Sequence, residues 1–180
     1  MPEPETFLFD RVKTPVGDIV LVADEEGALR FTWLHDGVGW RAAFERRYPG
    51  VALRAGKDPA GHSSALRAYF AGDIFILDKL PVTFAGTPFQ IKVWKALRRI
   101  AGGTTTSYGA LAKKIGEPKA VRAVGLANGS NPVGVVVPCH RVIGSDGSLT
   151  GYGGGLPRKR WLLEHEARHT AANFRLESTA

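Results

Sequence analysis

The sequence predicts an α+β protein in which a small α/β half precedes a mainly helical half. Three short apolar runs separated by turns open the chain, and segments with helical spacing of apolar residues follow. A break rich in glycine and proline at residues 84–88 separates the halves. We therefore expect an N-terminal domain at residues 1–85, a C-terminal domain at 86–170 and a polar tail at 171–180. With 44% hydrophobic residues, a chain of this length can bury a real core.

The first half predicts a three-stranded antiparallel sheet and two helices. Residues 7–12 and 18–23 flank a Thr-Pro-Val-Gly turn, and residues 28–34 follow a Glu-Glu-Gly turn. Residues 39–48 and 63–71 have helical spacing and end at Pro-Gly and at glycine. No catalytic group of residues stands out here, which indicates a scaffold.

The second half predicts a helix-turn-helix. Thr87 caps a helix with an apolar face that extends to Ile100. Ser107 then caps a helix over residues 108–115, closed by glycine, and a Glu-Pro pair starts a third helix over 119–128. Two short helices joined by a glycine turn are typical of this motif.

The helix at residues 119–128 is unusual because small side chains surround one large cation, Arg122. Small residues such as Ala123 and Gly125 would allow a close approach to a partner. An ordinary core helix built from small residues fits the same pattern, so the residues alone leave both interpretations open.

Charge is divided unevenly between the halves. Residues 1–85 carry 10 Lys/Arg against 12 Asp/Glu, and residues 86–166 carry 12 against 4. A basic half favours a polyanionic partner such as nucleic acid, although a merely basic protein would look the same. We find no signal-peptide pattern and no run of membrane-spanning length, so we expect a cytoplasmic protein with no membrane partner.

The single cysteine, Cys139, lies between Pro138 and His140, after an apolar run at 133–137 that predicts a short buried strand. One cysteine excludes an internal disulfide and a multi-thiolate zinc site. A lone cysteine is often a small core residue, but a neighbouring imidazole is the usual means of forming a reactive thiolate.

The helix predicted at residues 158–169 has two distinct faces. Glu164 shares a row with arginines and should be solvated, whereas Glu166 shares a row with Leu162 and Leu163 and should point inward. A buried carboxylate needs a partner, and a histidine could provide one.

The Pro-Cys-His-Arg-Val run at residues 138–142, with Asn131-Pro132 before it and Gly-Tyr-Gly-Gly-Gly at 151–155 after it, resembles the active-site signature of the O6-alkylguanine-DNA alkyltransferases. The resemblance covers about residues 86–166. It implies repair of O6-alkylguanine, and of O4-alkylthymine, in double-stranded DNA. The alkyl group would pass once, irreversibly, to Cys139, with no cofactor and no metal, in a monomer that could bind DNA cooperatively.

The resemblance also implies roles for individual residues. Glu166 would orient His140, which would take the Cys139 proton through a water molecule, and Asn131 would tie down the segment before the cysteine. Tyr108 would act on guanine N3, Lys159 would support O6, and the carbonyls of Cys139 and Val142 would accept from the exocyclic amine. Tyr152 and Gly153 would complete the substrate pocket. The residues implied to contact DNA are Ser107, Tyr108, Arg122, Ala123 and Gly125, with Arg122 replacing an everted nucleotide.

One glycine departs from the family pattern, and a second bears with it on the size of the pocket. Gly153 replaces a serine found in some members, and Gly134 together with Gly153 could widen the pocket for groups larger than methyl. A lesion-binding module, a cysteine hydrolase and a helix-turn-helix transcription regulator remain alternatives. The cysteine argues against the first, the basic helix pair against the second, and the lack of an effector domain against the third.

Overall fold

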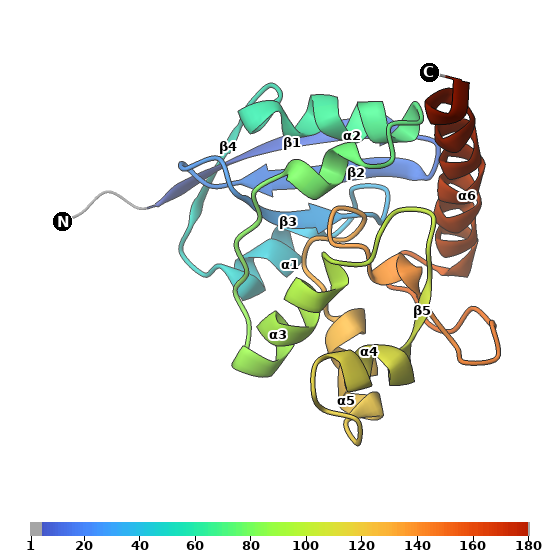
Figure 1. Cartoon of the computed structure of the whole chain (residues 1–180). Helices are drawn as coiled ribbons and strands as arrows, with labels where there is room; N and C mark the ends of the chain where they lie inside the picture. The colour runs from blue at the N-terminus through green and yellow to red at the C-terminus, as the bar shows by residue number, and fades with distance from the viewer. Residues whose placement is uncertain (1–4, 180) are drawn as a thin grey trace.

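The predicted α+β class is confirmed in the computed structural model, which describes residues 5–179 and the side chains of that range as far as residue 170. β1 (Thr6–Thr14), β2 (Gly17–Ala23), β3 (Leu29–Trp33) and β4 (Ala52–Ala55) form one sheet in the order β3-β2-β1-β4 (Figure 1). The three predicted strands pair antiparallel as expected.

The prediction of a three-stranded, purely antiparallel sheet is wrong in one respect, because β4 adds a fourth strand parallel to β1. Its four residues show no apolar alternation, and Arg54 and Ala55 are exposed. The strand exists because the edge of β1 offers free backbone groups, and that is a tertiary effect invisible in a local pattern.

Both faces of the sheet are buried, since alternate residues of β2 point into two different clusters. On one face, α1 (Trp40–Arg47) packs its Trp40 and Phe44 against Val20 and Val22. On the other face lie α2 (His62–Phe70) and the C-terminal half, joined in one large core (Figure 1). Two 3₁₀ helices, η1 (Pro59–Gly61) and η2 (Ile76–Lys79), flank α2.

The C-terminal half begins with α3 (Pro88–Leu97), whose predicted N-cap is confirmed. The Thr87 hydroxyl accepts from the Gln90 amide and the Gln90 side chain accepts from the Thr87 amide, a reciprocal capping box. Trp94 of α3 is fully buried and donates to the carbonyl of Ala127 at 2.8 Å. This bond joins α3 to the next helices of the half.

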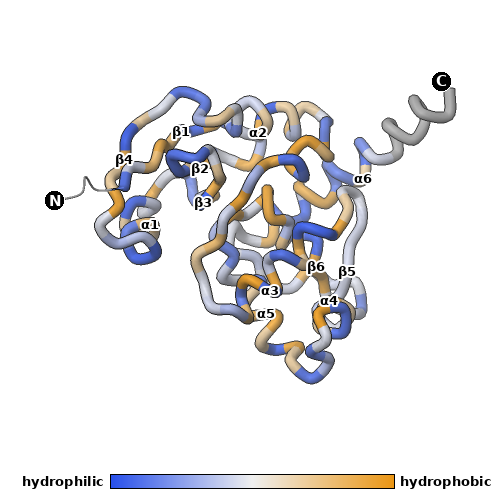
Figure 2. Tube along the Cα trace, turned by 60° about the vertical axis from the view of Figure 1, so that its left-hand side comes forward, coloured by the Kyte–Doolittle hydropathy of each residue, from blue (hydrophilic) through white to orange (hydrophobic). Residues whose placement is uncertain are grey.

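The predicted helix-turn-helix consists of α4 (Tyr108–Lys114) and α5 (Val121–Gly129), which lie beside α3 in Figures 1 and 2. Gly116, in the turn between them, has φ of 78° and so needs a residue without a Cβ. The strand before α4, β5 (Thr106–Ser107), pairs in parallel with β6 (Val142–Ile143), just after the cysteine.

The strand predicted at residues 133–137 is not formed. The segment is buried, but it makes only an isolated bridge between Gly134 and Val137, and Val135 has φ of 71°. It is a turn because no neighbouring strand offers it a ladder. Its polar groups are satisfied instead by Arg98, which donates to the Val136 carbonyl at 3.1 Å, and by Asn131.

The last helix, α6 (Leu156–Thr179), is longer than the predicted 158–169. Its backbone continues through most of the predicted tail at 171–180, whose side chains lie outside the described residues. The division into domains at residues 1–85 and 86–170 stays a prediction. None of the helices within residues 5–179 combines the length and the apolar character needed to cross a bilayer.

Candidate active site

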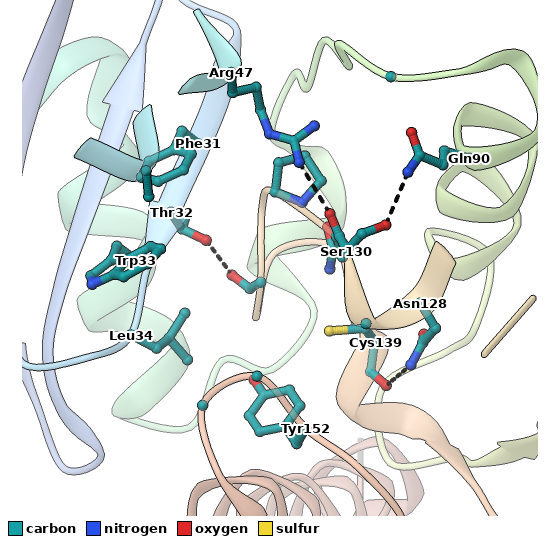
Figure 3. Close-up of a pocket in the computed structure, with 18 of the residues that line it drawn as sticks. Phe31, Thr32, Trp33, Leu34, Arg47, Gln90, Asn128, Ser130, Cys139 and Tyr152 are labelled. Atoms are coloured by element: carbon teal, nitrogen blue, oxygen red, sulfur yellow. Dashed lines mark hydrogen bonds between the residues drawn. The ribbon is translucent and has the colours of Figure 1, made fainter. Parts of the chain in front are cut away.

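A cavity of about 860 Å³ opens between the two halves of the molecule. One wall is β3 with Phe31 to Leu34, and the opposite wall is the end of α5 with the segment around Cys139. Figure 3 shows the Cys139 sulfur pointing into this space, across from Leu34 and close to the Tyr152 ring. The structure thus places the lone cysteine at the surface of a cavity that is far larger than the thiol requires.

Cys139 begins η3 (Cys139–Arg141), the turn that directly follows Pro138. Its amide donates to the Val137 carbonyl at 2.8 Å, and Asn131 donates to that same carbonyl at 2.8 Å. Burial raises the pKa of the Cys139 thiol, while a hydrogen bond from Asn131 and the charge of Lys159 act in the opposite direction. Because the rise prevails, the thiol needs a base in order to react.

His140 is completely buried, and its Nε2 lies 2.8 Å from Oε1 of Glu166. A carboxylate can only accept, so Nε2 carries the proton and Nδ1 of the neutral ring is an acceptor. Nδ1 has no hydrogen-bond partner among the described residues. Burial lowers the pKa of His140 although Glu166 opposes this shift, so the ring is a neutral proton acceptor.

Glu166 points inward, as its row in α6 predicts, and Glu164 is exposed. Sequence reasoning found the His140 partner but missed two other side chains that donate to Glu166. Arg141 makes a forked contact through Nε to Oε2 at 2.9 Å and Nη2 to Oε1 at 2.8 Å, and the Tyr69 hydroxyl donates to Oε1 at 2.8 Å. The missed signal is that a buried carboxylate needs more donors than one imidazole supplies.

Lys159 is buried in α6, and its ammonium donates to the carbonyls of Val142 at 2.7 Å, Thr150 at 3.0 Å and Gly151 at 3.3 Å. Burial lowers the pKa of Lys159. Val142 does not line the cavity, and its carbonyl is already bound to this ammonium. The Cys139 carbonyl accepts from Asn128 at 3.4 Å, so both predicted carbonyl acceptors have a partner.

Two tyrosines, Tyr108 and Tyr152, line the cavity. Tyr108, at the start of α4, donates to the Thr150 carbonyl at 3.1 Å, so it ties the glycine-rich loop to α4. The Tyr152 hydroxyl is buried without a hydrogen-bond partner among the described residues, and burial raises its pKa well above the usual range. Gly153 lines the cavity as well.

The residues predicted to contact DNA lie on α4 and α5 or at the N-cap of α4. Arg122 and Ala123 are exposed on α5, and Gly125 lines the cavity. Leu126, on the same helix, is 70% exposed, which is unusual for a large apolar side chain. Ser107 uses its hydroxyl to cap α4, accepting from Ala110 at 3.0 Å.

No group of three or more His, Cys, Asp or Glu side chains is placed to hold a metal ion within the part of the chain that the structure describes.

The buried carboxylate makes stability depend on pH. Burial disfavours the Glu166 charge, but hydrogen bonds from His140 and Arg141, together with the charge of Arg141, outweigh it and bring the pKa of Glu166 well below its ordinary 4.5. A lowered folded pKa means that the stabilisation is complete above about pH 4.5 and is lost as the pH falls below that value.

We therefore expect Glu166→Gln to reduce the free energy of unfolding by about 3–5 kcal/mol at neutral pH, because Arg141 is left buried without its counter-charge. In urea unfolding, this difference from wild type should shrink as the pH falls from about 5 to about 3. The exposed Glu164→Gln should follow wild type throughout. A difference for Glu166→Gln that stays constant with pH would contradict the assignment.

Comparison with known proteins agrees with this arrangement. Residues 88–168 match the family model described as the DNA-binding domain of 6-O-methylguanine DNA methyltransferase. A methylated-DNA–protein-cysteine methyltransferase of Shigella flexneri is 46% identical over 168 residues, covering 88% of this chain and 95% of its own.

Solved structures extend the likeness to the whole fold. A crystal structure of Mycobacterium tuberculosis O6-methylguanine methyltransferase has a TM-score of 0.77 at 40% identity, covering 91% of this chain and 94% of its own. A structure of the M. tuberculosis protein in complex with DNA has a TM-score of 0.75 with the same identity and coverage. With its buried Cys139, the histidine beside it and the glutamate that holds that histidine, the chain belongs to the methylated-DNA–protein-cysteine methyltransferases.

Proposed function

We propose that this protein repairs O6-alkylguanine in double-stranded DNA by taking the alkyl group onto Cys139 in a reaction that each molecule performs once. The observation that carries the proposal is the placement of Cys139 in a cavity lined in part by α5, next to a buried, neutral His140 held by Glu166. This is the nucleophile, base and orienting carboxylate of a thiol reaction.

The chemical steps follow from the protonation states. A water molecule passes the Cys139 proton to Nδ1 of His140, and Nε2 keeps its hydrogen bond to Glu166. The sulfur attacks the alkyl carbon and forms an S–C bond, while the C–O6 bond breaks and its electron pair goes to the guanine. Tyr108 turns its hydroxyl from the Thr150 carbonyl to guanine N3 and stabilises the leaving base, and Lys159 holds the loop around it.

The product explains why the protein acts only once. S-alkylcysteine is a thioether with no good leaving group, and no second cysteine is present to regenerate the thiol. An O4-alkylthymine presents the same alkyl–oxygen bond and would be a second substrate. Cys139 must stay reduced to react, which suits the cytoplasm.

The target base must leave the helix to reach Cys139, since this residue is only 7% exposed and lines a cavity. The exposed face of α5 supports entry from the minor groove, because Ala123 and Gly125 allow close approach and Arg122 projects from it. Arg122 fills the place of the everted nucleotide. The M. tuberculosis relative solved in complex with DNA supports the same partner for this chain.

The first test is the intact mass of the protein after mixing with limiting and then excess O6-methylguanine DNA. We expect a gain of one CH₂ unit (about 14 Da) per protein, localised to Cys139 and absent in Cys139→Ala, since the thiolate is the acceptor. Binding without a mass change would mean a lesion-binding module. Several turnovers that leave the protein unmodified would mean a hydrolase, and either result would overturn the proposal.

Arg122→Ala should slow transfer from duplex DNA by about tenfold or more, because the vacancy left by the everted base is no longer filled. Transfer from free O6-benzylguanine, which needs no eversion, should stay within about twofold of wild type. Single-turnover rates with both substrates measure the difference, and the exposed Arg54→Ala is the control for lost charge. Equal slowing on both substrates would contradict a role in eversion.

The cavity should accept alkyl groups larger than methyl. A Cβ at Gly134 would lie 3.3 Å from Cδ1 of Leu34 and 3.8 Å from the Thr32 hydroxyl, so the glycine keeps this part of the cavity open. We expect comparable rates on methyl and benzyl adducts, and a fall of about tenfold in the benzyl-to-methyl ratio for Gly134→Val. Gly109→Ala, where a Cβ meets nothing within 4 Å, is the control. Strict methyl preference in the wild type would rule the idea out.

A further inference from the structure

Tyr69 reaches the active site from the N-terminal half of the chain. It lies in α2, its side chain is fully buried, and its hydroxyl donates to Oε1 of Glu166 at 2.8 Å, although 97 residues separate the two in sequence. The steps proposed above for alkyl transfer do not use this contact.

The oxygen that Tyr69 contacts is the one that holds His140. Oε1 of Glu166 accepts from His140 Nε2, from Arg141 Nη2 and from the Tyr69 hydroxyl, each at 2.8 Å. The second oxygen accepts from Arg141 Nε at 2.9 Å and from the Gly103 amide at 3.4 Å. Three donors therefore fix Oε1, and one of them comes from the other half of the molecule.

Tyr69 is itself held rigidly. Its ring makes edge-to-face contacts with Phe70 at 5.1 Å and His165 at 5.3 Å between centroids, and its carbonyl accepts from His165 Nε2 at 2.7 Å. Burial and the charge of Glu166 raise the pKa of Tyr69 well above its usual range, so the hydroxyl remains a donor. A rigid, permanent donor can hold the position of the carboxylate oxygen.

We propose, on the basis of the alkyl transfer proposed above, that Tyr69 is a positioning residue for that reaction. Its hydroxyl fixes the Glu166 oxygen that accepts from His140, and this oxygen in turn sets the orientation of the His140 ring. Each donor on Oε1 also takes a share of its negative charge. With three donors on Oε1, the negative charge of Glu166 stabilises protonated His140 less strongly. The ring therefore stays neutral and can accept the proton of the Cys139 thiol.

Other titratable groups surround this carboxylate, and none of them replaces the Tyr69 hydroxyl. Those that face Glu166 or His140 come from η2, η3, the glycine-rich loop and α6, and they are Asp78, Cys139, Arg141, Tyr152, Lys159 and His165. Of these, only Arg141 also donates to Oε1 among the hydrogen bonds of the described residues. Loss of the Tyr69 hydroxyl should therefore act on His140 directly.

The test is Tyr69→Phe, which removes one oxygen and keeps the ring. Intact mass measures the rate of Cys139 alkylation under single-turnover conditions with O6-methylguanine DNA, at pH values that span the acidic limb of the pH–rate profile. We expect the acidic limb to move to higher pH by about half a pH unit to one pH unit. Without the Tyr69 hydroxyl, the Glu166 carboxylate stabilises protonated His140 more strongly and raises the His140 pKa, and His140 must be neutral to act. Below the limb the rate should fall by about three- to tenfold, and above it the rate should stay within about twofold.

Tyr48→Phe is the matched control. Tyr48 is also buried, and its hydroxyl donates to the Arg30 carbonyl at 3.2 Å in the separate core beneath α1. Its pH–rate profile should coincide with that of wild type. A Tyr69→Phe profile that also coincides with wild type overturns the inference while leaving alkyl transfer intact, whereas no transfer by wild type overturns both.

A second variant covers the case in which Tyr69→Phe does not fold. Site-specific 3-fluorotyrosine at position 69 keeps the hydroxyl and makes it a stronger donor, so the acidic limb should move to lower pH. A limb that does not move in this variant would overturn the inference independently of Tyr69→Phe.

Discussion

The buried carboxylate of Glu166 is the constraint on which the rest of the structure depends. Glu166 is 0% exposed, and a buried charge is costly unless hydrogen-bond donors surround it. Here the donors come from α2, from η3 and from the backbone before β5. The carboxylate itself comes from α6. One ionised group therefore joins the N-terminal half, the turn that contains Cys139 and the last helix, and it can do so only when all of them are in place.

The turn before the cysteine is the second requirement. In an extended strand, neighbouring side chains point to opposite faces of a sheet, and that would fix the directions of Cys139 and His140. The chain instead bends through Val135, whose φ of 71° is uncommon for a β-branched residue, and enters a 3₁₀ turn at Cys139. Asn131 and Arg98 hold this bend by donating to carbonyls within it. Cys139 then faces the cavity while His140 faces Glu166.

The N-terminal half contributes more than support. β3 forms one wall of the cavity, and Thr32 donates to the Gly134 carbonyl at 3.0 Å across it (Figure 3). Tyr69 adds a hydrogen bond to the Glu166 carboxylate, which holds the histidine beside Cys139. The half without a catalytic motif therefore shapes both the space in front of the thiol and the electrostatics behind it.

The sequence alone determined the α+β class, the helix-turn-helix, the Thr87 and Ser107 caps and the inward direction of Glu166. Each of these depends on the spacing of residues within one element, on the order of elements along the chain or on a local cap. Only the tertiary structure decided what depends on distant segments. The fourth strand forms only because the edge of β1 is free to pair with it. The run before Cys139 is a turn because no neighbouring strand pairs with it. Arg141 and Tyr69 contact Glu166 because its buried charge requires hydrogen-bond donors, and the fold brings these two from distant segments.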